Sequence, residues 1–142
     1  MSNGESEAPG ELGSKVLEFE KTIKSIVGRA GEPGFGAAQW APLAELVAVD
    51  TFERVGNWLE VMNWSEYMAF LTKWASASTA FETTLRRISE LPGLVFLELQ
   101  ETNTSAAGSS VVNSLSVYEF DEAGKIRHLD IYLQHEGSPR AE

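Results

Sequence analysis

The segment from Phe81 to Gln134 constrains the fold of this chain more than any other part. It contains four stretches rich in strand-forming residues, separated by turn residues, at 81–89, 94–102, 111–120 and 126–134. The last turn, Asp121-Glu122-Ala123-Gly124, is typical of a type I turn with glycine at the left-handed position. Successive strands joined by short turns predict an antiparallel sheet.

The first half of the chain has helical patterns. Apolar residues spaced by three and four predict a helix from Ser14 to about Gly28, with a stripe of Val16, Phe19, Ile23, Ile26 and Val27. A second, short helix is expected at Pro42, and a third opens at Asn63 or Ser65, either of which would cap it. A short strand, 49–55, is expected between them. The order predicts an α+β protein with three N-terminal helices on one face of a mostly antiparallel sheet.

The length of 142 residues is that of one domain. We assign the domain to residues 14–135. The head, residues 1–13, is rich in glycine, glutamate and serine and is expected to be disordered, and residues 136–142 are expected to form a frayed tail.

Composition excludes several classes of function. The net charge of −10 opposes binding to nucleic acids and to anionic membranes. The chain has no cysteine, and its two histidines lack ligand partners at metal-binding spacing, so we expect no metal site. The chain has no glycine-rich loop of the kind that binds phosphate groups, so we expect no cofactor. No apolar run reaches the ~18 residues of a spanning helix, and the N-terminus lacks a signal-peptide pattern, so we expect a cytoplasmic protein.

Three features of the chain resemble the NTF2-like superfamily, which includes SnoaL-like polyketide cyclases and ketosteroid isomerases. They are Trp40 ahead of Leu43 and Leu46, the segment Val-Asp-Thr-Phe-Glu-Arg-Val-Gly at 49–56, and Phe-Asp-Glu-Ala-Gly-Lys-Ile at 120–126. The resemblance covers residues 14–134. It implies a cone in which a curved sheet folds around the helices. It also implies a cavity that binds apolar, often cyclic molecules, and a homodimer through the outer face of the sheet.

The resemblance also implies positions for catalytic groups. The base carboxylate of isomerase-like members falls at Val55, which takes no proton. Glu53, two residues earlier and on the same face of the strand, is therefore the candidate base. The acid of those members falls on Ser116, whose hydroxyl is a weaker donor than a protonated carboxyl in an apolar site.

Alternation along the last strand separates its two faces. Leu129, Ile131 and Leu133 share an apolar face that should line the cavity. The other face carries His128, Asp130 and Tyr132 and should point outward. These three side chains resemble a catalytic cluster. We expect them instead to form an exposed or dimer-interface ladder.

The register of strand 111–120 stays open at this point. The turn pairs Asp121 with Lys125, which would place Val117 opposite Leu129 and Leu115 opposite Ile131. The family resemblance instead turns Ser116 inward. A bulge in the strand would reconcile the two.

Aromatic and basic residues add further candidates. Trp58, in a loop beside Gly56, is a candidate lid over the cavity, whereas Trp74 is either part of such an aromatic lid or ordinary core. One of Arg86 and Arg87 could enter the cavity and bind an anionic group, and the alternative is a surface contact with Glu98 or Gln100 on the next strand. The full candidate ligand-binding set is Val55, Trp58, Trp74, Ser116, Leu129, Ile131 and Leu133.

The sequence therefore predicts a protein that binds a small, mainly apolar molecule, of a cyclic or polyketide-like kind, with cyclase or isomerase chemistry as one option. The alternative is a non-catalytic NTF2-like module for dimerisation or protein interaction. The sequence alone does not decide whether the protein is an enzyme.

Overall fold

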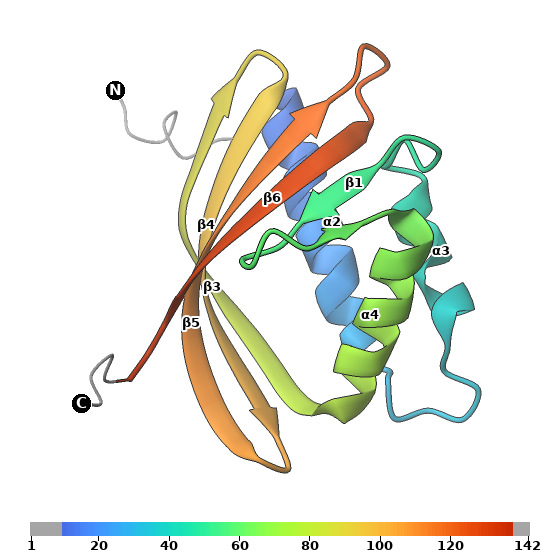
Figure 1. Cartoon of the computed structure of the whole chain (residues 1–142), viewed down its shortest axis with the longest axis vertical. Helices are drawn as coiled ribbons and strands as arrows, with labels where there is room; N and C mark the ends of the chain where they lie inside the picture. The colour runs from blue at the N-terminus through green and yellow to red at the C-terminus, as the bar shows by residue number, and fades with distance from the viewer. Residues whose placement is uncertain (1–9, 138–142) are drawn as a thin grey trace.

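We describe residues 10–137 of a computed structural model of the chain (Figure 1). Residues 1–9 and 138–142, which make up most of the expected head and tail, lie outside the described residues. The first helix begins at Glu11 rather than Ser14, so the last part of the expected head is helical.

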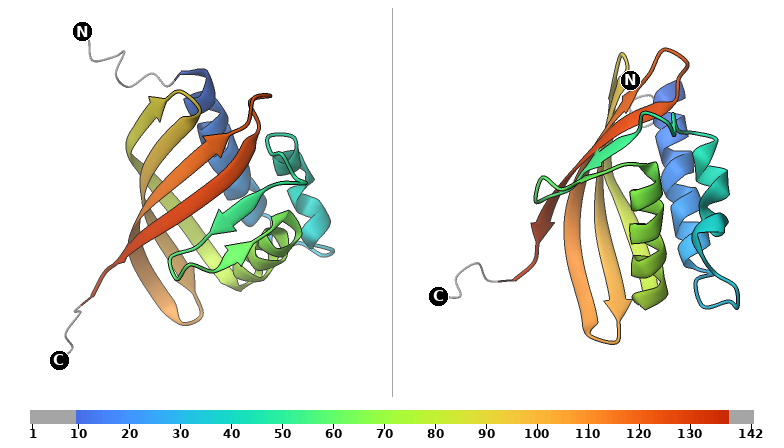
Figure 2. Two further views of the ribbon diagram at one scale, coloured as in Figure 1. Left: turned by 45° about the horizontal axis from the view of Figure 1, so that its top comes forward. Right: turned by 45° about the vertical axis from the view of Figure 1, so that its right-hand side comes forward.

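The helices are those that the sequence predicts. They are α2 (Glu11–Val27), α3 (Ala41–Ala44), which follows a 3₁₀ turn η1 (Ala37–Trp40), and α4 (Trp64–Ala77). Within residues 10–137, no helix is long and apolar enough to cross a membrane. Figures 1 and 2 show all of these helices on one side of the sheet.

The sheet has six strands in the order β2-β1-β6-β5-β4-β3. Their bounds are β1 (Glu53–Val55), β2 (Val61–Met62), β3 (Ser78–Leu91), β4 (Leu94–Ser105), β5 (Gly108–Phe120) and β6 (Ile126–His135). Only β1 and β6 pair in parallel, so the sheet is mostly antiparallel. The long strands curve around the helices (Figure 2). The short strand β2 was not expected, and β1 is shorter than the predicted 49–55.

Helix α2 buries the stripe that its sequence predicts and packs on β3 and β4. Its first turn has no side-chain cap of its own. Instead, Glu90 of β3 accepts a hydrogen bond from the Gly13 N–H at 2.9 Å. A carboxylate at this end also suits the positive end of the helix dipole.

Helix α4 begins at a capping box. The Asn63 side chain accepts from the Glu66 N–H at 2.8 Å, and Glu66 accepts from the Asn63 N–H at 2.9 Å. Of the two caps that the sequence allows, Asn63 is therefore the one used, and Ser65 lies within the helix. The box fixes the start of the helix that carries Tyr67.

The register between β5 and β6 differs from the one that the turn alone predicts. Ser116 pairs with Ile131 and Tyr118 with Leu129, because the ladder steps at Phe120↔Ile126 and leaves Arg127 unpaired. This irregularity is the bulge that reconciles the hairpin with the family pattern, although it adds its extra residue to β6. The pairing of Val117 with Leu129 is wrong, and Ser116 faces inward, as the resemblance implies.

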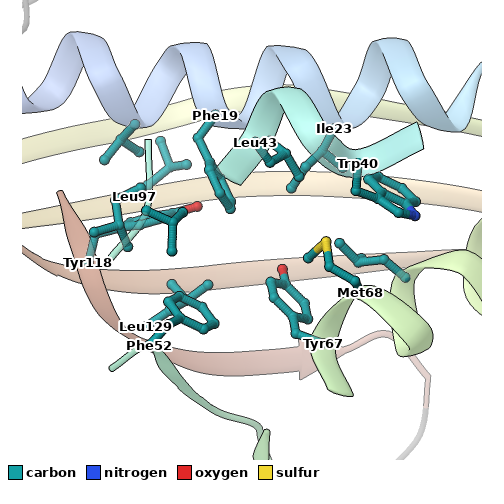
Figure 3. Close-up of a cluster of buried hydrophobic side chains, with 14 of the residues drawn as sticks. Phe19, Ile23, Trp40, Leu43, Phe52, Tyr67, Met68, Leu97, Tyr118 and Leu129 are labelled. Carbon is teal, nitrogen blue, oxygen red and sulfur yellow. The ribbon is translucent and has the colours of Figure 1, made fainter. Parts of the chain in front are cut away.

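The core lies between the inner face of the sheet and the helices (Figure 3). Its largest fully buried side chains include Trp40, Phe19 and Tyr118. The Trp40 indole N–H donates to Thr72 of α4 at 2.8 Å, so the polar atom of this large residue is satisfied. The hydroxyl groups of Tyr67 and Tyr118 point into the interior from α4 and β5, in a region that is not fully packed (Figure 3).

Candidate functional site

A cavity of about 200 Å³ lies between the inner face of the sheet and helices α2 and α4. Most of its wall is apolar, with a few convergent polar groups, which is the usual character of a small-molecule site. The polar lining residues are Glu20, Arg54, Tyr67, Glu101, Ser114, Ser116 and Tyr118. The apolar ones are Ile23, Phe70, Leu71, Trp74, Phe81, Leu129, Ile131 and Leu133.

Glu20 is the carboxylate that α2 contributes to this cavity. The Tyr118 hydroxyl donates a hydrogen bond to Glu20 Oε2. Burial raises the pKa of Glu20 from an ordinary value of 4.5 to about 7; the Tyr118 hydrogen bond lowers it, and the negative charge of Glu101 raises it. A carboxyl with a pKa near neutrality can both give and take a proton, which is the property of a general acid or base.

Glu101 of β4 supplies a second carboxylate. The Ser114 hydroxyl of β5 donates to Glu101 Oε2 at 2.7 Å. Burial raises the pKa of Glu101, and this hydrogen bond acts in the opposite direction. Two carboxyl groups with raised pKa values in one apolar cavity are candidates for a functional site.

Arg54 is the only cationic residue among those that line the cavity. Its guanidinium carbon lies 5.1 Å from the centre of the Tyr67 ring and 5.2 Å from that of Phe70. Its Nη1 lies 3.7 Å from Glu60 Oε2, beyond hydrogen-bonding distance. Gly56 makes room for that carboxylate, since an added Cβ there would lie 1.8 Å from Glu60 Oε2.

Tyr67 lies among the charged groups and beside the aromatic residues of α4. It stacks on Phe52 at a centroid distance of 5.8 Å. Burial raises the pKa of Tyr67, and the positive charge of Arg54 opposes this effect. The phenol therefore stays protonated at neutral pH and can donate a hydrogen bond to a ligand.

The structure distributes the residues proposed from the sequence between two faces. Glu53 pairs with His128 and Val55 with Asp130, so both lie on the outer face, and the Glu53 side chain is 59% exposed. Trp58 lies in the turn between β1 and β2, is 80% exposed and does not line the cavity. The remaining five line it: Trp74, Ser116, Leu129, Ile131 and Leu133.

The outer face holds the cluster that resembles a catalytic group. His128 Nε2 lies 2.9 Å from Asp130 Oδ1, and Nδ1 lies 3.5 Å from Glu53 Oε1. Glu119, His128 and Asp130 each offer a possible metal ligand within 4.8 Å of the others. These side chains already have partners. His128 and Asp130 contact each other, and Arg127 donates a hydrogen bond to Glu119 at 2.8 Å. The expectation of no metal site stays a prediction.

Of the two arginines on β3, Arg87 forms the ion pair with Glu98 of β4 that the sequence suggests, at 2.7 Å. Neither Arg86 nor Arg87 lines the cavity. The cationic group of the cavity comes instead from β1, at the far side of the sheet from β3.

Glu20, Arg54 and Glu101 are not among the site residues predicted from the sequence, yet each carries a local signal. Glu20 stands four residues after Val16 and three before Ile23, in the middle of an apolar helical face. Glu101 continues the alternation of the buried Val95, Leu97 and Leu99 on β4, and Arg54 follows the buried Phe52 by two residues. In each case a charged residue occupies a position that its pattern assigns to the interior.

No family model matches the sequence, and no curated protein matches it. Solved structures do resemble the fold. A protein assigned as a SnoaL-like polyketide cyclase, from Shewanella denitrificans, superimposes with a TM-score of 0.72 at 8% identity, over 89% of this chain and 92% of that one. An NTF2-like protein from Anabaena variabilis gives 0.68 at 11% identity, over 92% and 96%.

A third resemblance is to the BvnE pinacolase from Penicillium brevicompactum, with a TM-score of 0.63 at 13% identity, over 92% of this chain and 90% of that one. At such low identities the comparisons show the fold alone. The chain has the NTF2-like fold that SnoaL-like proteins share, as its sequence motifs suggested.

Proposed function

We propose that the protein binds a small, mainly apolar molecule in the cavity and transfers a proton to or from it through Glu20. The observation that carries this proposal is the pairing of a carboxyl on α2 with the Tyr118 hydroxyl inside an otherwise apolar cavity. The volume of about 200 Å³ is below the roughly 300–1,000 Å³ of pockets for drug-sized ligands, so the ligand is small.

The reaction class is proton transfer at a carbon next to a carbonyl group, the step that cyclase and isomerase reactions share. Ionised Glu20 takes the proton as the C–H bond breaks, and the electron pair moves to the carbonyl oxygen to give an enolate. The Tyr67 hydroxyl and the Arg54 guanidinium supply donors for the negative charge that develops on that oxygen. The proton held on Glu20 exchanges with solvent, and Glu20 then delivers a solvent-derived proton to carbon as the enolate collapses to the ketone, which restores the carboxylate.

The test uses a small bicyclic ketone, 1-tetralone, in deuterated water. Exchange of its α-protons is followed by NMR with the wild type and with Glu20→Gln. Glu18→Gln, which changes an exposed residue of the same helix, is the control. We expect the wild type to accelerate exchange, with a rate that rises through pH about 7 as Glu20 ionises. Glu20→Gln should lower the rate by about 10²- to 10⁴-fold, the usual contribution of a general base.

Two results would contradict the proposal in different ways. If 1-tetralone binds but exchanges no faster than in buffer, Glu20 has no role as a base and the protein is a binding protein. If no small apolar molecule binds, the non-catalytic interaction module is the better description.

We also propose a homodimer through the outer face of the sheet. Half-buried apolar residues cross this face on neighbouring strands, with Phe96 opposite Val117 and Leu115 opposite Tyr132. Tyr132 is 55% exposed. An apolar band of this kind on a sheet face suits a second copy of the same surface.

A further inference from the structure

The guanidinium of Arg54 is buried without hydrogen bonds on two of its three nitrogens. The residue is 9% exposed, and neither Nε nor Nη1 has a hydrogen-bond partner. A guanidinium has five N–H donors in a fixed fork, and leaving buried donors unpaired is costly, most of all on a charged group. The free protein therefore holds, at the wall of its cavity, a cation with two nitrogens that have no hydrogen-bond partner.

The local structure holds this side chain in place without satisfying it. The parallel pairing of Arg54 with Leu129 turns it to the inner face, and the rings of Tyr67 and Phe70 pack against the guanidinium. Its single ion pair among the described residues is with Glu60, at 3.7 Å, and that carboxylate is 41% exposed. Glu60 also accepts a hydrogen bond from the Trp58 N–H, so it is shared with its own turn.

We propose that Arg54 is a subsite for a carboxylate group on the otherwise apolar ligand. A carboxylate matches the planar fork of a guanidinium with two parallel hydrogen bonds. Among anions, the charges favour a monoanion over a dianion, because the cavity has one cationic residue and two carboxyl groups, Glu20 and Glu101. A phosphate dianion would meet repulsion from both of these and gain only one cation.

This inference rests on the proposed function, since it concerns the ligand of the same cavity. It adds a chemical class, a small aromatic or aliphatic carboxylic acid. It also gives a function to the two Arg54 nitrogens that have no hydrogen-bond partner.

The test compares two probes of the same size and shape, trans-cinnamate and cinnamamide, by titration calorimetry at pH 6. At this pH, below the pKa of Glu20, repulsion from that carboxyl is reduced. We expect the wild type to bind cinnamate about 10- to 100-fold more tightly than cinnamamide, the usual effect of a charge-assisted hydrogen-bonded pair. Arg54→Met should abolish this preference, because the variant has no cation to pair with the carboxylate.

Two further variants sharpen the test. Arg87→Met removes an arginine that does not line the cavity and should keep the preference. Glu60→Gln removes the competing carboxylate from an exposed turn and should tighten cinnamate binding several-fold. This second variant tests Arg54 even if Arg54→Met fails to fold.

Each contrary outcome has one meaning. Equal binding of the two probes to the wild type overturns the carboxylate subsite and leaves the small-molecule function intact. A preference that persists in Arg54→Met overturns the assignment to Arg54. Failure of both probes to bind overturns the proposed function, and the subsite with it.

Discussion

Glu20 lies beside the apolar stripe of α2. Val16, Phe19 and Ile23 surround its position on α2, and each of them is buried. The Tyr118 hydroxyl is the hydrogen-bond partner of its carboxyl. Compared with a carboxyl in water, the protonated form of Glu20 is favoured here, because desolvation penalises the charge more than one hydrogen bond relieves it.

The raised pKa of Glu20 predicts how stability depends on pH. The folded state binds this proton more tightly than the unfolded chain, so the stabilisation is complete below pH 4.5 and is lost as the pH rises to about 7. At ~1.4 kcal/mol per pKa unit, the loss is at most about 3 kcal/mol. Glu20→Gln, which cannot ionise, should lack this loss and become more stable than the wild type above pH 7.

The measurement is chemical unfolding of the wild type and of Glu20→Gln at pH 5 and pH 8.5. The difference between the two proteins isolates Glu20 from the other groups that titrate. Glu18→Gln, exposed on the same helix, should follow the wild type at both pH values. A pH-independent difference between Glu20→Gln and the wild type would show that this carboxyl has an ordinary pKa.

At the scale of elements, α4 depends on the capping box at its start. Asn63→Ala removes the acceptor for the Glu66 N–H and should lower the free energy of unfolding by about 1 kcal/mol. Ser65→Ala, two residues further and exposed, should change it by less than about 0.5 kcal/mol. Urea unfolding of both variants gives the comparison, and equal effects would mean that Asn63 does not cap the helix.

Elements whose burial pattern is local could be predicted from the sequence. The apolar stripe of α2 and the four long strands are read from spacings within single segments, and the structure has all of them. The face of β1 could not be predicted in this way. Alternation shows that Glu53 and Val55 share a face, but their pairing with β6, more than seventy residues later in the chain, decides that this face is the outer one and turns Arg54 inward.

The bulge at Arg127 is a second feature that single-segment patterns do not determine. Without it, the hairpin turn would align the apolar face of β6 with Leu115 and Val117. With it, Ser116 and Tyr118 face the cavity instead. The polar wall of the site thus depends on one unpaired residue, which only the three-dimensional pairing of β5 with β6 reveals.

At the scale of the whole molecule, the net charge of −10 sets the conditions for dimerisation. Two copies of an acidic chain repel each other at low ionic strength, and salt screens this repulsion within about 10 Å at 0.1 M. A dimer held by the apolar band on the outer face should therefore tighten as salt is added. An interface held by ion pairs would weaken under the same change.

Sedimentation measurements at 20 mM and 500 mM salt give the fraction of dimer of this 15.6 kDa chain, and so distinguish an apolar interface from one held by ion pairs. We expect the dimer fraction to rise with salt for the wild type. Tyr132→Asp, which adds a charge to the apolar band opposite Leu115, should give a monomer at both salt concentrations, whereas Tyr132→Phe should behave as the wild type. Because Tyr132 points away from the cavity, Tyr132→Asp should still bind cinnamamide. A wild-type monomer at every concentration and salt would remove the outer face as an interface and leave the cavity as the functional surface of this fold.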